Sequence, residues 1–249
     1  MQSRSSRLAV LIDADNASAR IADGLFEEIA KIGEASVRRI YGDFSSSRMK
    51  GWADVLAKYA IIPQQQFAYT TGKNASDITL VIDAMDLLHS GRFDGFCLVS
   101  SDSDFTRLAA RIREQGVDVF GFGEQKTPES FRQACRRFIY TENLVPEAPS
   151  AGTRSTGRTL EPLDHAGRLL IRVIADMDSD DGWVGLGLVG SQLANLAPDF
   201  DPRTYGVKKL SDLVRKLEAL ELQETESGHL RVRARRELEP TPAPARKRR

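Results

Sequence analysis

The 249-residue chain has few of the features that mark membrane, secreted or zinc-binding proteins. Two cysteines, three histidines and no CxxC motif argue against a zinc site. No apolar run reaches the roughly 18 residues that a membrane-spanning helix requires. The polar N-terminus leads straight into an apolar run, so we expect no signal peptide and a cytoplasmic location. A net charge of zero, with 41% hydrophobic residues, is typical of a soluble globular protein.

Net neutrality conceals a basic C-terminal end. Its cations are Arg231, Arg233, Arg235, Arg236, Arg246, Lys247, Arg248 and Arg249. Only Glu237 and Glu239 oppose them. Such an end can contact nucleic-acid phosphates, or it can be a solvated, disordered terminus, and both interpretations stay open. We expect residues 234–249 to form a basic disordered tail.

Aspartates stand at the ends of short apolar runs. Leu8–Ile12 ends at Asp13, and Phe96–Val99 is followed, through two serines, by Asp102 and Asp104. Such runs predict buried parallel strands with carboxylates at their carboxyl ends. Ligands bind at that edge of an open α/β sheet. Because converging carboxylates repel one another unless a cation neutralises them, the pattern predicts a Mg²⁺ or Mn²⁺ site.

A fourth aspartate, Asp77, begins a predicted helix at 77–88. The apolar positions of one expected buried face follow helical spacing: Ile78, Val81, Ile82, Met85 and Leu88. Asp77 would lie in the first turn and still face the sheet edge. The preceding loop holds Lys73 and Asn74, which could meet a scissile phosphate, although a loop lysine is usually only solvated.

Strands and helices alternate through the first 145 residues. Strands are expected at 8–13, 36–41, 61–67, 96–100, 117–122 and 138–140, and helices at 18–32, 52–59, 77–88, 105–115 and 130–137. Repeated strand–helix units with right-handed crossovers predict an α/β fold with a doubly wound, mainly parallel sheet. Residues 146–162, rich in Pro, Ala, Gly, Ser and Thr, predict a flexible linker.

A second, smaller domain is expected at 163–233. The pattern predicts helices at 164–177, 188–196 and 205–220, then a β-hairpin at 222–232 with Ser227-Gly228 at its turn. Three helices followed by a hairpin describe a winged-helix-like domain, a relative of the helix-turn-helix class.

The acidic residues have simpler interpretations as well. Aspartate is favoured at helix starts and turns, so capping can explain one or two of them. Asp15 could only cap the turn after Asp13, while the amide of Asn16 could bind metal or substrate. Asp43 ends a strand in a Gly-Asp turn, a common turn pair. Capping does not explain why several separate elements all place acid at one edge.

Taken together, these motifs resemble the NYN domain, of the LabA-like group within the PIN-like nucleases. The similar stretches are Leu11–Asn16, Lys73–Asp77 and Val99–Phe105, within residues 7–142. The resemblance implies a PIN-like α/β fold and a quartet of acids that binds Mg²⁺ or Mn²⁺ for RNA hydrolysis. Its members here would be Asp13, Asp77, Asp102 and Asp104, with Asn16 adjoining. We expect the substrate to contact Asn16, Lys73, Asn74 and Ser101.

The second domain resembles the LOTUS domain, also called OST-HTH. The similar stretches are Asp181–Val184, Pro198–Arg203 and Lys209–Val214. The resemblance implies binding of RNA or of a protein partner. Arg203, Lys208 and Lys209 are the cations expected to contact RNA, with a solvated charged face as the alternative, and Trp183 is expected in the core.

The sequence therefore predicts a Mg²⁺- or Mn²⁺-dependent ribonuclease with a C-terminal RNA-binding domain. One alternative is a phosphatase of the haloacid dehalogenase type, in which Asp13 would be the nucleophile and Asp15 the acid/base. Ala17 stands where that class expects Thr or Val. The other alternative is a non-catalytic RNA-binding or adaptor protein.

Overall fold

The computed structural model describes residues 5–66, 75–145, 160–177, 179 and 181–235. The chain divides into two compact units. Unit 1 runs to residue 159 and also takes in residues 194–204, and unit 2 comprises residues 160–193 and those from 205 onward. In the described ranges, no helix combines the length and the apolar character that crossing a membrane demands.

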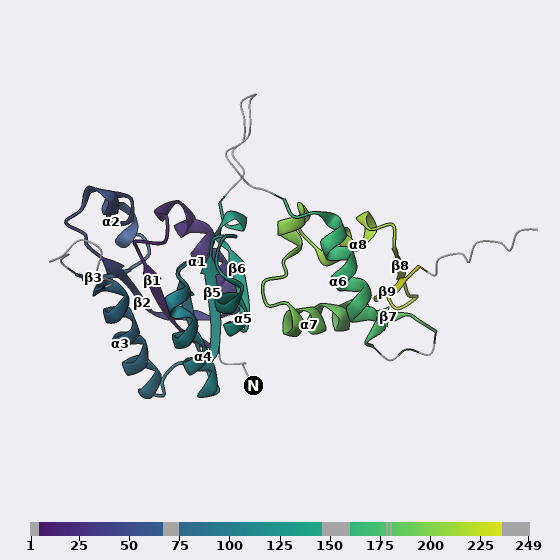
Figure 1. The fold of residues 1–249 in the computed structure, drawn as a ribbon, viewed down its shortest axis with the longest axis horizontal. Helices are drawn as coiled ribbons and strands as arrows, with labels where there is room; N and C mark the ends of the chain where they lie inside the picture. Colours follow the sequence, from purple (N-terminus) through teal and green to yellow (C-terminus); the bar gives the residue numbers. More distant parts are fainter. Residues whose placement is uncertain (1–4, 67–74, 146–159, 178, 180, 236–249) are drawn as a thin grey trace, which may run out of the picture. The chain divides into compact units, whose positions relative to one another are not determined.

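Unit 1 is built on a six-stranded sheet (Figure 1). Its strands are β1 Arg7–Asp13, β2 Glu34–Gly42, β3 Ile62–Gln65, β4 Gly95–Val99, β5 Asp118–Gly123 and β6 Arg137–Tyr140. They run in the order β3-β2-β1-β4-β5-β6, and every neighbouring pair is parallel. The predicted doubly wound parallel sheet is confirmed. All six carboxyl ends therefore meet one edge, and the strand order reverses between β1 and β4.

Helices cover both faces of this sheet, which explains the unbroken apolar run of β1. They are α1 Ala22–Ile32, α2 Lys50–Leu56, α3 Ala75–His89, α4 Thr106–Glu114 and α5 Glu129–Ala134, with short 3₁₀ turns η1 Ala19–Ile21, η2 Ser47–Met49, η3 Ser103–Phe105 and η4 Thr141–Asn143. Val10 and Ile12 pack in the core that contains α1 residues, whereas Ala9 and Leu11 pack in the core that contains α3 and α4 residues. A strand buried on both faces needs no polar alternation.

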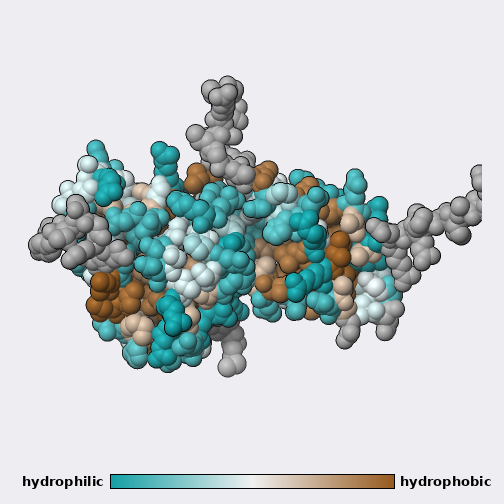
Figure 2. Space-filling model, viewed as in Figure 1, coloured by the Kyte–Doolittle hydropathy of each residue, from teal (hydrophilic) through white to brown (hydrophobic). Residues whose placement is uncertain are grey.

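The helix predicted at 77–88 is confirmed as α3, and three of the five residues predicted for its buried face do meet the core: Leu88 is buried, and Val81 and Met85 are partly buried against it. The prediction is wrong for the other two. Ile78 and Ile82 are 62% and 56% exposed, and Figure 2 shows a brown patch over α3. Leu80 and Ala84 face the core instead. The helix carries apolar residues on several sides, so two faces fit the helical spacing. Leu80, with Ala84 four residues on, lies against the sheet.

Unit 2 combines helices with a small antiparallel sheet. Its elements are α6 Leu163–Ala175, β7 Val184–Gly185, α7 Leu186–Leu196 (whose last residues belong to unit 1), α8 Leu210–Lys216, β8 Leu220–Glu224 and β9 Leu230–Ala234, in the strand order β7-β9-β8. The predicted hairpin is confirmed. The helix predicted at 205–220 spans only α8, because Gly206 adopts a φ of 76° and Lys209 is extended. A 3₁₀ turn, η5 Pro202–Tyr205, precedes that glycine.

Candidate active site at the carboxyl edge of the sheet

Asp13, the last residue of β1, is held by hydrogen bonds to both carboxylate oxygens. Oδ1 accepts the backbone N–H groups of Asp15 (3.1 Å) and Asn16 (3.3 Å). Oδ2 accepts the Asn16 side-chain amide (2.8 Å) and the Ser100 hydroxyl (2.7 Å). The side chain is only 1% exposed, and this burial raises its pKa against the opposing effect of the hydrogen bonds. The carboxylate is therefore fixed in orientation before any ligand arrives.

Ser100 links Asp13 to the acidic turn after β4. Its hydroxyl donates to Asp13 and accepts the backbone N–H of Asp102 (3.0 Å). Asp102 in turn caps η3, because its Oδ1 accepts the Asp104 N–H (2.9 Å). The capping interpretation of Asp102 is thus correct for its Oδ1. The cap does not use the second carboxylate oxygen, Oδ2, which could bind a ligand.

Replacing Ser100 with alanine should cost about 1–2 kcal/mol of folding stability, because a buried donor–acceptor bridge is lost. The Asp13 carboxylate should also lose part of its fixed orientation. Urea unfolding of Ser100→Ala beside Ser103→Ala, an exposed serine three residues on, gives the comparison. Equal stabilities for the two variants would contradict the bridging role.

Asp77, in the first turn of α3, lies in the field of the other aspartates. Its pKa is raised from 3.8 to about 6, first by burial and then by the charges of Asp13, Asp102, Asp15 and Asp104. A neighbouring contact supports the same closeness, since the Ser76 hydroxyl donates to Asp15 (3.2 Å). The carboxylates predicted to converge from β1, α3 and the turn after β4 are brought together at the point where the strand order reverses.

The chemistry of these donors fits a divalent cation. Aspartate oxygens are the hard ligands that Mg²⁺ and Mn²⁺ prefer, and the mutual repulsion felt by Asp77 is what a cation would relieve. The side chains do not form a complete coordination site. Across the described ranges, no group of three or more His, Cys, Asp or Glu residues is placed to hold a metal ion. Because Asp13 is held by its hydrogen bonds, binding would require the other carboxylates to move toward the ion.

The remaining predicted site residues differ in what they contact. Asn16 is exposed, and its side-chain amide donates to Asp13. The Ser101 hydroxyl accepts the Glu124 N–H (2.8 Å) and so links the turn after β4 to the turn after β5. Asp43 accepts the Gln65 side-chain amide (2.8 Å), consistent with a structural turn. The candidates Lys73 and Asn74 lie outside the described residues.

The three cations that were expected to contact RNA in the second domain differ in their surroundings. Arg203 pairs with Asp201 (2.6 Å) and with the buried Glu28 of α1 (3.1 Å), both within unit 1. Burial would raise the pKa of Glu28, but the hydrogen bond from Lys31, the charge and hydrogen bond of Arg203 and the charge of Arg137 together lower it. The structure thus gives Arg203 a structural pairing, while Lys208 and Lys209 are exposed. Trp183, expected in the core, is half-buried with the guanidinium of Arg233 4.5 Å from its ring centre.

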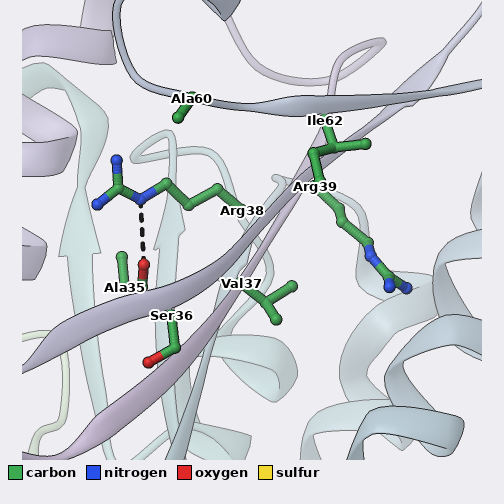
Figure 3. Close-up of a pocket in the computed structure, with 7 residues that line it drawn as sticks. All are labelled: Ala35, Ser36, Val37, Arg38, Arg39, Ala60 and Ile62. Atoms are coloured by element: carbon green, nitrogen blue, oxygen red, sulfur yellow. Dashed lines mark hydrogen bonds between the residues drawn. The ribbon is translucent and has the colours of Figure 1, made fainter.

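A separate pocket of about 300 Å³ lies beside the amino half of β2 (Figure 3). Its lining is Ala35, Ser36, Val37, Arg38, Arg39, Ala60 and Ile62. Arg38 donates to the Ala35 carbonyl (3.1 Å), and Arg39 pairs with Asp83 of α3 (2.8 Å). No aspartate of the acidic site lines this pocket, so it does not extend that site.

The solved structures that are similar to this chain include two partial likenesses. One is a crystal structure of a protein of unknown function from Vibrio parahaemolyticus, 19% identical with a TM-score of 0.47, covering 56% of this chain and 96% of that one. The other is a solution structure of an uncharacterized protein from Nitrosomonas europaea, 29% identical with a TM-score of 0.28, covering 37% and 90%. With TM-scores below 0.5, neither contributes to the functional assignment. No curated protein matches the chain.

Family models match both parts of the sequence. The NYN domain model covers residues 7–143, more than half of the chain, and the OST-HTH/LOTUS domain model covers residues 161–232. The fold agrees, because the NYN domain is PIN-like and the sheet of unit 1 is parallel with helices on both faces. The chain belongs to the NYN-domain proteins of the PIN-like nuclease superfamily, with an OST-HTH/LOTUS domain after the NYN domain.

Proposed function

We propose that this protein is a Mg²⁺- or Mn²⁺-dependent ribonuclease that hydrolyses RNA phosphodiesters at Asp13, Asp77, Asp102 and Asp104. The observation that carries the proposal is the convergence of carboxylates from β1, α3 and the turn after β4 at one edge of the sheet, where burial and then the neighbouring charges raise the pKa of Asp77 to about 6. A protein gains no stability from such repulsion. Groups perturbed in this way are concentrated at functional sites, and membership of a nuclease superfamily favours catalysis.

Each residue has a distinct task in this proposal. The four aspartates hold the ion, which would lower the pKa of a bound water and offset charge on the phosphate. Ser100 and the Asn16 amide orient Asp13, since both donate to its Oδ2. Asn16, exposed at the rim, also contacts RNA once the strand is bound. Orientation fixed before binding costs no rearrangement during the reaction.

The C-terminal domain supplies further affinity for RNA. Its OST-HTH/LOTUS match supports RNA binding, and the exposed Lys208 and Lys209 before α8 are cations suited to phosphates. Because the two domains share one chain, RNA held by one is present at a high effective concentration for the other. A protein partner for this domain is the competing proposal.

Labelled single-stranded and duplex RNA and DNA, incubated with the full chain and Mn²⁺, Mg²⁺ or EDTA, test the function. We expect RNA cleavage with either ion and none with EDTA. RNA binding without cleavage would instead support the adaptor. Hydrolysis of a phosphomonoester such as 4-nitrophenyl phosphate, lost on Asp15→Ala, would support the phosphatase. The proposed nuclease tolerates that substitution with only a modest loss, because Asp15 lies beside the quartet.

A further inference from the structure

A group of exposed cations lies on the elements that border the acidic turn. Arg20 belongs to η1, which follows β1 and its aspartate. Arg48 and Lys50 belong to η2 and the start of α2, which follow the neighbouring strand β2. We call η1, η2 and α2 together the η1–α2 ridge. Since β1 and β2 are parallel neighbours, the ridge emerges at the same edge of the sheet as Asp13.

Tertiary contacts fix the ridge in place. Trp52 of α2, 2% exposed, donates its indole N–H to the Ala17 carbonyl just before η1 (2.9 Å). A Cβ added at Gly51 would lie 3.3 Å from the Ala19 Cβ, so η1 and α2 touch. The acidic turn is tied to the same strand, because the Ala14 N–H donates to the Tyr41 carbonyl of β2 (2.9 Å). The cations are therefore carried on a rigid border of the acidic site.

These three cations differ from most others in unit 1. Throughout the described part of the chain, Arg20, Arg48 and Lys50 have exposed side chains and form no ion pair. By contrast, Lys58, near the far end of α2, is paired with Asp23. Asp54, four residues after Lys50, is exposed on α2. The surface over α2 is hydrophilic in Figure 2.

We infer that the η1–α2 ridge binds the phosphates of the RNA strand adjacent to the bond that is cleaved. The inference rests on the proposed function and adds where the substrate lies. An acidic cluster repels a polyanion, so a nuclease needs cations that hold the flanking phosphates without neutralising the cluster itself. Unpaired arginines and lysines on a firm surface meet that need, and such contacts position nucleic acid without reading its sequence.

Kinetics of the full chain separate this role from chemistry. The triple variant Arg20→Ala/Arg48→Ala/Lys50→Ala should raise KM for an RNA oligonucleotide roughly tenfold or more and leave kcat unchanged. The salt dependence of log(kcat/KM) should flatten by about 2, since each single-strand phosphate contact contributes about 0.7. Hydrolysis of bis(4-nitrophenyl) phosphate, a diester too small to reach the ridge, should not change.

Arg92→Ala is the matched control, because Arg92 is exposed between α3 and β4, at the opposite, amino edge of the sheet. A triple variant that behaves like Arg92→Ala toward RNA would overturn the inference, as would equal losses on RNA and on the small diester. If the wild type cleaves neither substrate, the proposed function fails on its own. Photocross-linking with 4-thiouridine RNA then tests RNA binding by the η1–α2 ridge directly. Cross-links in residues 19–21 or 47–56 would support the inference, and their absence would overturn it.

Discussion

Asp13→Asn is expected to lower metal-dependent RNA cleavage by about 10³-fold or more while the protein stays folded. A metal ion supplies several kcal/mol of transition-state stabilisation, and each 1.36 kcal/mol corresponds to a factor of ten in rate. The substitution removes the charge at the end of β1 and turns one acceptor of the Asn16 and Ser100 hydrogen bonds into a donor. Both the ion and the arrangement that orients its ligand are affected.

Asp15→Asn is the control for this prediction. Asp15 is an exposed acid in the same turn and changes by the same single charge, yet among the described residues its side chain accepts a hydrogen bond from the Ser76 hydroxyl alone. We expect it to retain activity within about tenfold of the wild type, which corresponds to roughly 1.4 kcal/mol. Equal losses in Asp13→Asn and Asp15→Asn would indicate that general negative charge, and not a defined ligand, supports cleavage. Urea unfolding of both variants checks the fold.

Asp77→Asn is expected to abolish cleavage and also to stabilise the ion-free protein at pH 7. The pKa of Asp77 is about 6 in the folded chain against 3.8 for the free group. Two units correspond to roughly 3 kcal/mol, which partial exposure reduces to about 1–2 kcal/mol. Loss of a favourable acid at the start of α3 opposes this by a smaller amount, about 0.5 kcal/mol. Relief of repulsion therefore outweighs the helix-dipole effect.

The sign of this effect fixes its pH dependence. Because the folded pKa is the higher one, the protonated acid favours the folded state below pH 4, and that contribution is lost as the pH rises through 6. The advantage of Asp77→Asn over the wild type should therefore grow between pH 4 and 6 and then level off. Urea unfolding in EDTA across this range measures it, with the exposed Asp86→Asn on the same helix as control. A wild type more stable than Asp77→Asn at pH 7 would contradict the crowding of carboxylates.

Most of the fold could be predicted because its signals are local. Apolar runs such as Leu8–Ile12 end where the chain leaves the sheet, and helical periodicity identifies α3 and α6 without tertiary information. Parallel connection of these units then places every strand end at one edge. The aspartates after β1 and β4 could be assigned to one site from this rule alone.

Other features depend on partners distant in sequence. Ser100 was not singled out, although the register pairs Ile12 with Val99 and so makes Asp13 and Ser100 the next residues along their strands. Arg203 was expected to contact RNA. Its buried partner, Glu28, lies 175 positions away, so the local sequence gives no sign of their ion pair. Periodicity could not choose between two apolar faces of α3, and only packing against the sheet decides.

Binding of Mn²⁺ to the full chain without RNA, measured from the electron paramagnetic resonance of the free ion, tests the central claim most directly. We predict binding to the wild type at pH 7.5 and an affinity at least tenfold lower at pH 5, where Asp77, with a pKa of about 6, retains its proton. Asp13→Asn and Asp102→Asn should lose the site at both pH values. Equal affinity in the wild type and both variants would contradict a divalent-ion site at the carboxyl edge of the sheet.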